Sequence, residues 1–226
     1  MISRRRVLFF GAATCLSGPL PFIRARADLG ASTPIPREPS RIAFKIIRKG
    51  EAIGTHILDF TPREDGVDIN IAVDIAVQFG PIVVYRYKLR GLEQWRGGAP
   101  FHLEALTNHD GTKHEMRADW TPEGPWVTSM DVSSYLAPRE ALPATHWNQD
   151  ELVRPWINPE DGKLLHPVVG TPTATEIALA DGQKRTVERY TLTGDAQLDL
   201  LYDTEHRWTA LEFTAGDGSH IIYAPM

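Results

Sequence analysis

Apolar and polar residues alternate along most of this chain with a period of two. In the clearest stretch, residues 67–77, every second residue is Val or Ile, and Asp, Asn or Ala stands between them. Side chains of a β-strand alternate between the two faces of a sheet, whereas an amphipathic helix places apolar residues three and four positions apart. Residues 67–77 therefore predict a strand with one apolar face.

Similar stretches recur along the chain and are separated by turn residues. Asp-Gly pairs, a strong hairpin signal, stand at 110–111, 181–182 and 217–218. Strands are predicted over residues 42–46, 53–60, 67–77, 83–96, 101–108, 113–120, 126–130, 173–180, 184–193, 196–203, 208–215 and 219–223. Strands joined by hairpins favour an all-β fold, a curved antiparallel meander that forms a half-barrel or open barrel.

The alternation stops over residues 131–168. Residues 133–142 are expected to form a short helix, limited by Pro138 and Pro143, and the rest is irregular. A connection of this length is uncommon in a compact domain unless it has a function. We interpret residues 131–168 as a lid-like insertion with short helical and irregular structure.

The N-terminus has the pattern of an export signal. Ser3 is followed by three arginines and a weakly apolar stretch, and Ala25-Arg26-Ala27 offers a small-x-small cleavage site. We predict a twin-arginine signal peptide over residues 1–27, cleaved after Ala27, a linker over 28–39 and a single β domain over 40–226. The twin-arginine translocase and signal peptidase are then export partners, and the destination is the periplasm. Lipidation of Cys15 is the alternative.

Cleavage changes the charge of the chain. The signal segment holds five arginines and no acidic residue, so 19 Lys and Arg remain against 29 Asp and Glu, a formal charge of −10. Such a surface repels nucleic acid, so no nucleic-acid partner is expected. The single cysteine lies in the signal segment, which excludes a disulfide or a thiol enzyme in the remainder.

No motif for a metal, cofactor or nucleophile is present. The eight histidines include no His-x-His or His-x-x-x-His pair, and there is no Gly-x-Ser-x-Gly elbow, phosphate loop or dinucleotide fingerprint. We therefore predict no metal site and no cofactor. His109 and His114 flank a hairpin turn and are interpreted as solvated turn residues.

Aromatic and polar residues supply candidates for a ligand site. Aromatic side chains of the predicted strands are expected on the inner surface of the sheet, mainly as core. They include Tyr85, Tyr87, Trp95, Trp120, Trp126, Tyr190 and Tyr202. Ligand-binding candidates are Tyr85, Tyr87, Glu93, Trp95, His146 and Trp147. We expect Glu93 to pair with an arginine and His146 to bond loop backbone. No catalytic residue is assigned.

Several segments resemble one family of exported bacterial proteins. They are Phe44–His56, Tyr85-Arg86-Tyr87, Glu93-Gln94-Trp95, His146-Trp147-Asn148, Leu200-Leu201-Tyr202-Asp203 and Gly218-Ser219. These segments are similar to the family of domain of unknown function 6134, over most of the chain after the signal. The opening hairpin also resembles the lipoprotein-carrier-like fold of the periplasm, which implies a curved antiparallel sheet around an apolar cavity. Neither resemblance implies an activity.

Three functions follow as hypotheses. The first is a periplasmic binding or carrier protein for an apolar or amphipathic, lipid-like molecule. The second is an exported hydrolase-type enzyme that uses Glu93 or His146, and these residues must then converge in a cleft. The third is an accessory or scaffold protein for another exported protein, which predicts an exposed apolar patch or an unpaired edge strand. The sequence favours the first and leaves the oligomeric state open.

Overall fold

The computed structural model describes residues 33–178 and 182–226. The predicted signal peptide, its cleavage site at Ala27, Cys15 and the first part of the predicted linker lie outside these residues. Among the described residues, no helix has the length and apolar character needed to cross a membrane.

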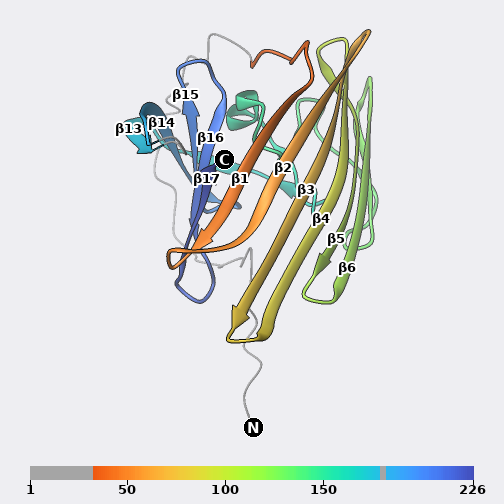
Figure 1. The fold of residues 1–226 in the computed structure, drawn as a ribbon. Coiled ribbons are helices and arrows are strands. Elements are labelled where there is room, and N and C mark those ends of the chain that lie inside the picture. Colours follow the sequence, from red (N-terminus) through yellow and green to blue (C-terminus); the bar gives the residue numbers. More distant parts are fainter. Residues whose placement is uncertain (1–32, 179–181) are drawn as a thin grey trace, which may run out of the picture.

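The alternating stretches form long antiparallel strands, as the sequence predicts (Figure 1). The first seven are β1 (Ser40–Arg48), β2 (Glu51–Arg63), β3 (Gly66–Phe79), β4 (Ile82–Arg96), β5 (Ala99–His109), β6 (Thr112–Thr121) and β7 (Gly124–Ser129). The last six are β12 (Pro167–Val169), β13 (Thr173–Ala178), β14 (Lys184–Gly194), β15 (Leu198–Asp203), β16 (Trp208–Thr214) and β17 (His220–Pro225).

These strands and the short β8 (Tyr135–Leu136) form one curved sheet that does not close on itself. The described residues contribute 14 strands, in the order β12-β14-β15-β16-β17-β1-β2-β3-β4-β5-β6-β7-β8, with β13 also paired to β14. Strand β1 therefore lies inside the sheet, between β2 and the last strand, β17. The predicted curved meander in the form of an open barrel is confirmed.

The apolar faces of the strands point to the inside of the curve and form the main core. On β3, Val67, Ile69, Ile71, Val73 and Ile75 are all buried, as the alternation predicts. The inward-facing residues of β4 are those paired with inward-facing residues of β3. Glu93 lies opposite Ile69, and Trp95 lies opposite Val67. Period-two alternation therefore decides which β4 residues face inward.

Residues 131–168, called the inner segment below, contain little regular structure. Besides β8 they hold β9 (Leu142–Pro143), β10 (Trp156–Ile157) and β11 (Leu164–Leu165), which form a small separate sheet, and the start of β12. A 3-10 helix, η1 (Gln149–Val153), is capped by the side chain of Asn148. The predicted helix at 133–142 is wrong. Tyr135 and Leu136 pair with β7 instead, and Pro138 interrupts any helical run.

The inner segment packs against the inner face of the sheet. Its apolar side chains Leu142, Trp147, Leu152 and Trp156 are buried in the main core, and the Trp147 ring meets the Phe60 ring edge-on at 5.4 Å. The predicted role of the aromatic residues as core holds for Tyr85, Trp95, Tyr190 and Tyr202, which are buried. Trp126 is an exception, since it points outward and is largely exposed.

Candidate functional site

Glu93 lies on the inner face of β4 and accepts hydrogen bonds from two indole rings. Its Oε1 atom is 2.5 Å from Nε1 of Trp95 on the same strand and 3.0 Å from Nε1 of Trp147 in the inner segment. The two indoles meet edge-to-face, with ring centroids 5.2 Å apart. The expectation that Glu93 pairs with an arginine is wrong, because Arg90 and Arg96 of the same strand point to the opposite face.

The Glu93 carboxyl group is completely enclosed. The residue has no exposed surface, and its Oε2 atom has no hydrogen-bond partner among the described residues. Burial disfavours the charged form and raises the pKa of Glu93 to about 7, and the nearby Glu151 adds to the rise. Both indoles and Thr145 act in the opposite direction, because they interact favourably with the carboxylate. Glu93 is therefore poised between its neutral and charged forms near neutral pH.

His146 forms a separate pair with the buried Glu151. Its Nδ1 atom is 2.6 Å from Oε1 of Glu151, its backbone N–H donates to Oε2 of the same carboxylate, and its carbonyl accepts from the Tyr202 hydroxyl at 2.8 Å. The backbone of His146 has φ 67°, a left-handed conformation that is uncommon outside glycine. The expectation that loop backbone satisfies the His146 side chain is wrong, because a carboxylate does so.

Glu93 and His146 do not form a shared catalytic cleft. No hydrogen bond or ion pair joins their side chains in the part of the chain that the structure describes, and each is bonded to other groups. Glu93 and Glu151 are both buried, with 0% and 1% of their surface exposed. A substrate therefore has no approach to either carboxylate in this conformation.

A surface cleft opens at the end of the sheet where β1, β2 and β16 meet the inner segment. We call it the aromatic cleft; its volume is about 770 Å³. Its apolar lining includes Ile42, Phe44, Phe60, Trp147 and Trp208. Phe44 and Trp208 stack with a tilt at 4.3 Å between ring centroids. Of the six predicted ligand-binding residues, Trp147 alone lines this cleft.

The charged lining of the aromatic cleft consists of three arginines, Arg41, Arg185 and Arg207, and one acid, Glu205. Two of the arginines are held by Asp203, at 3.4 Å from Arg185 and 2.8 Å from Arg207. Arg41 forms a two-point ion pair with Asp59. Each guanidinium group has five N–H donors, so donors remain for a bound molecule.

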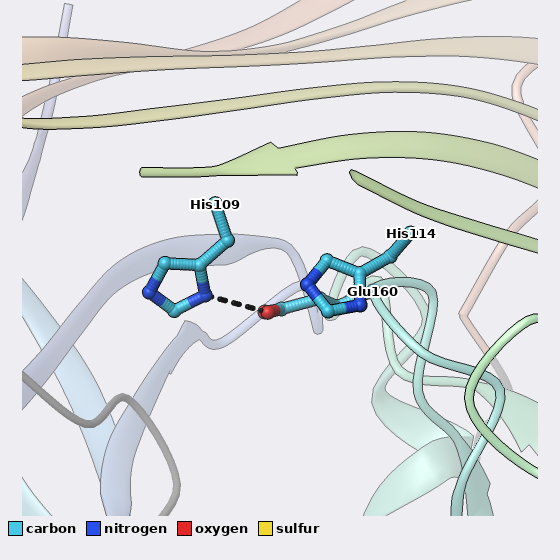
Figure 2. Close-up of side chains that lie close together, drawn as sticks. All are labelled: His109, His114 and Glu160. Atoms are coloured by element: carbon cyan, nitrogen blue, oxygen red, sulfur yellow. Dashed lines mark hydrogen bonds and ion pairs between the residues drawn. The ribbon is translucent and has the colours of Figure 1, made fainter. Parts of the chain in front are cut away.

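A third polar group lies where the β5–β6 hairpin faces the inner segment, and its centre is His109, His114 and Glu160 (Figure 2). The Nδ1 atom of His109 is 2.9 Å from Oε1 of Glu160. Tyr85 and Tyr87, two of the predicted ligand-binding residues, belong to this group. The Tyr85 hydroxyl lies 3.2 Å from His109 Nε2, and the Tyr87 hydroxyl donates to Glu160 Oε2 at 3.3 Å.

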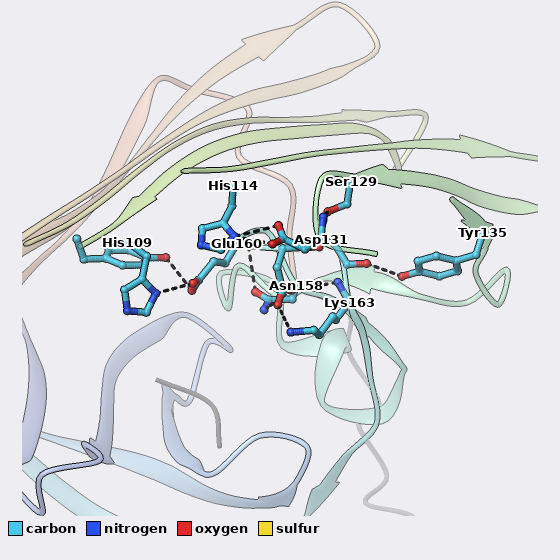
Figure 3. A network of polar contacts seen from close by, with 11 residues as sticks. His109, His114, Ser129, Asp131, Tyr135, Asn158, Glu160 and Lys163 are labelled. Atoms are coloured by element: carbon cyan, nitrogen blue, oxygen red, sulfur yellow. Dashed lines mark hydrogen bonds and ion pairs between the residues drawn. The ribbon is translucent and has the colours of Figure 1, made fainter. Parts of the chain in front are cut away.

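Further hydrogen bonds extend this group into the inner segment (Figure 3). The Nδ1 atom of His114 lies 2.9 Å from both carboxylate oxygens of Asp131. Asp161 binds Asn158 at 2.9 Å and Lys163 at 2.6 Å, so the loop that carries Glu160 is internally braced. The side chain of Glu160 is thus placed by a fixed loop.

The interpretation of His109 and His114 as solvated turn residues is wrong. Their side chains are 18% and 15% exposed, because the inner segment covers them. The sequence holds a signal that the spacing rules for metal motifs overlook. Asp110 and Gly111, both with positive φ, make a tight turn, and Thr107 lies directly opposite His114. His109, two residues from Thr107, shares that face, so the two histidines are diagonal neighbours.

Comparisons with known proteins place the fold without assigning an activity. Residues 44–226 match the family described as domain of unknown function 6134. A solved structure described as a beta-barrel-like protein of domain of unknown function 1849, from Brucella abortus, is similar with a TM-score of 0.56 and 10% identity, over 85% of this chain and 98% of that one. No curated protein matches. At that identity the likeness concerns the fold alone.

Proposed function

This chain belongs to the family of domain of unknown function 6134, and we propose that it is an exported binding protein that holds an amphipathic, lipid-like molecule in the aromatic cleft. The observation that carries the proposal is the cleft itself, with buried aromatic rings and arginine side chains in one lining. Its volume of about 770 Å³ is in the usual range for small-molecule sites, roughly 300–1,000 Å³.

The lining favours a molecule with an apolar body and an anionic end. Phe44, Phe60 and Trp208 contribute ring atoms to the apolar lining. The three guanidinium groups are paired with Asp59, Asp203 or Glu205 and keep further N–H donors. Arginine binds carboxylates and phosphates through paired N–H donors. A fatty acid or a lipid with an acidic head group has this combination of parts.

The export signal at Ser3 and the arginines after it support a site of action in the periplasm, where lipid-like molecules need carriers between membranes. The binding site proposed here differs from the one that the sequence favours. Tyr85, Glu93 and Trp95 lie in the filled interior, so a ligand there would have to displace the inner segment. The cleft needs no such displacement.

A fluorescent anionic amphiphile, dansylaminoundecanoic acid, tests this proposal. We expect saturable one-to-one binding by the purified protein, and competition by palmitate. Arg41→Glu should weaken binding by about tenfold, because it places a like charge beside the acidic end. The matched control is Arg117→Glu, since Arg117 forms a similar exposed pair with Asp119 on β6, away from the cleft. Absent binding, or equal loss in both variants, contradicts the proposal.

An accessory role is a second candidate, favoured by one observation. Phe79, Ile82 and Val84 are largely exposed at the tip of the β3–β4 hairpin, which projects at the lower end of the sheet in Figure 1. Exposed apolar groups of this kind suit contact with a partner. Two results together would favour this candidate. One stoichiometric partner would co-purify with the protein and be lost in the double variant Phe79→Ser, Ile82→Ser, and the protein would not bind the amphiphile. The hydrolase hypothesis has no such support.

A further inference from the structure

Two histidines and one glutamate converge on the inner face of the β5–β6 hairpin. One potential ligand atom from each of His109, His114 and Glu160 lies within 4.8 Å of the others. In a tetrahedral site with bonds of about 2.0 Å, ligand atoms are about 3.3 Å apart. The three atoms would therefore have to approach one another by at most about 1.5 Å to reach binding distance.

Each of the three side chains is oriented by a second polar group. Asp131 holds Nδ1 of His114, which leaves Nε2 of that ring for a metal. The Tyr85 hydroxyl lies beside Nε2 of His109, so that Nδ1 faces Glu160, and the Tyr87 hydroxyl binds the other oxygen of Glu160. Ligands of metal sites are commonly oriented in this way, and histidine ligands above all by carboxylates.

A buried hydroxyl lies beside the cluster. Thr107 lies directly opposite His114 on the same face, and its Oγ1 atom is buried without a hydrogen-bond partner among the described residues. Buried polar atoms are seldom left unpaired, and those that are call for an explanation. A water molecule bound to a metal at this site would give the hydroxyl a partner.

We propose that His109, His114 and Glu160 bind a divalent transition-metal ion, and that Zn²⁺ fits best. Two imidazoles and a carboxylate are a common donor set for zinc with one position open to water. Thiolate-preferring metals are disfavoured by the donor set, and Mg²⁺ and Ca²⁺ prefer sites made of oxygen atoms. The site shares no residue with the aromatic cleft, so the two proposals stand or fall separately.

Metal binding would join two parts of the fold. Glu160 comes from the inner segment, whereas His109 and His114 come from the β5–β6 hairpin. Without metal, the His109–Glu160 contact of 2.9 Å makes the same connection as a hydrogen bond or ion pair. The competing interpretation is that this pair is structural and binds no metal.

Isothermal titration of ZnCl₂ into protein purified without a polyhistidine tag and stripped with chelator tests the proposal. We expect one ion per chain, and a loss of affinity greater than about 100-fold in His114→Ala and in Glu160→Gln. Asp131→Asn should weaken binding by roughly 10- to 100-fold, as expected of a positioning residue. The control is His166→Ala, an exposed histidine near Asp195, which should bind as the unaltered protein does.

A second measurement does not depend on how the variants fold. Crystals of the unaltered protein grown with ZnCl₂ should show one anomalous-scattering peak bounded by His109, His114 and Glu160. Tetrahedral Co²⁺ in the same place should give the intense visible bands of a low-symmetry site. A peak at His166 or His220 alone, no peak, or equal affinity in His114→Ala and His166→Ala overturns the proposal in favour of a structural ion pair.

Discussion

The indole N–H of Trp147 donates to Oε1 of Glu93 across 3.0 Å, and this contact joins the inner segment to β4 over 54 positions of sequence. A carboxylate in an apolar interior needs such donors, because burial without them costs several kcal/mol. The contact also makes the stability of the fold depend on the protonation of Glu93.

The pH dependence of stability should therefore change in Glu93→Gln. The pKa of Glu93 is raised from 4.5 to about 7 in the folded protein, so the folded state binds more protons than the unfolded state between these values. Glu93 therefore contributes its full stabilisation to the folded state below pH 4.5, and this stabilisation is lost as the pH rises through 7. The free energy of unfolding falls by roughly 3 kcal/mol over this range. Urea unfolding at several pH values measures this. Equal slopes in both proteins would contradict it.

Trp147→Phe should destabilise the protein by about 2–4 kcal/mol. The variant removes a hydrogen bond to a buried carboxyl group and leaves a gap beside Trp95. Trp126→Phe is the matched control, because Trp126 is 47% exposed and its replacement should change the free energy of unfolding by less than about 0.5 kcal/mol. Chemical unfolding followed by circular dichroism compares the two, and similar losses would argue against the role given to Trp147.

His109 should stabilise the fold in acid more than in base. The Glu160 carboxylate raises the pKa of His109 above its ordinary 6.5, against the opposing effect of burial, and Asp110 adds to the rise. The groups that face the ring include Glu160, Tyr85, Tyr87 and His114.

A histidine whose pKa is raised in the folded state stabilises the protein fully at pH values below its pKa in the unfolded chain. This stabilisation is lost as the pH rises through its pKa in the folded protein. In chelator-treated protein, His109→Asn should therefore cost more free energy of unfolding at pH 5.5 than at pH 9. His166→Asn is the control for the removal of an exposed histidine outside this group. A greater cost of His109→Asn at pH 9 would show that the charged pair does not form.

Gly54→Ala should destabilise the β2–β3 pairing by more than about 2 kcal/mol. A Cβ atom at residue 54 would lie 2.0 Å from the carbonyl oxygen of Asp74, and backbone must move to make room. Gly50→Ala, in the β1–β2 turn, meets no atom within 4 Å and costs only the strain of its φ of 81°, about 1 kcal/mol. Thermal unfolding ranks the two variants; the reverse order would contradict the close approach.

The strands could be predicted because the residue patterns that specify them lie close together in the sequence. Alternation in β3 and the Asp-Gly turns each lie within a dozen residues, and the structure follows them closely. The inner face of β4 is equally local, because two-residue alternation places Glu93 and Trp95 on the same side of the strand.

The partners of those residues could not be predicted, because they come from the irregular inner segment. Nothing near Glu93 in the sequence indicates that Trp147 will lie over it, and Glu160 is 51 positions from His109. The same segment buries His114, which by its turn position alone looks solvated. Irregular chain has no periodicity from which its contacts follow.

The place of β1 within the sheet affects how the chain can be made. β1 pairs with β17 from Phe44↔Pro225 to Arg48↔Ile221, so one edge of an early strand stays unpaired until residues far later in the sequence have been made. Until those residues emerge, that edge offers unpaired backbone groups to other chains. A chain that stops short of His220 would keep this edge open permanently, and the unpaired backbone groups of β1 would make it prone to pair with other chains.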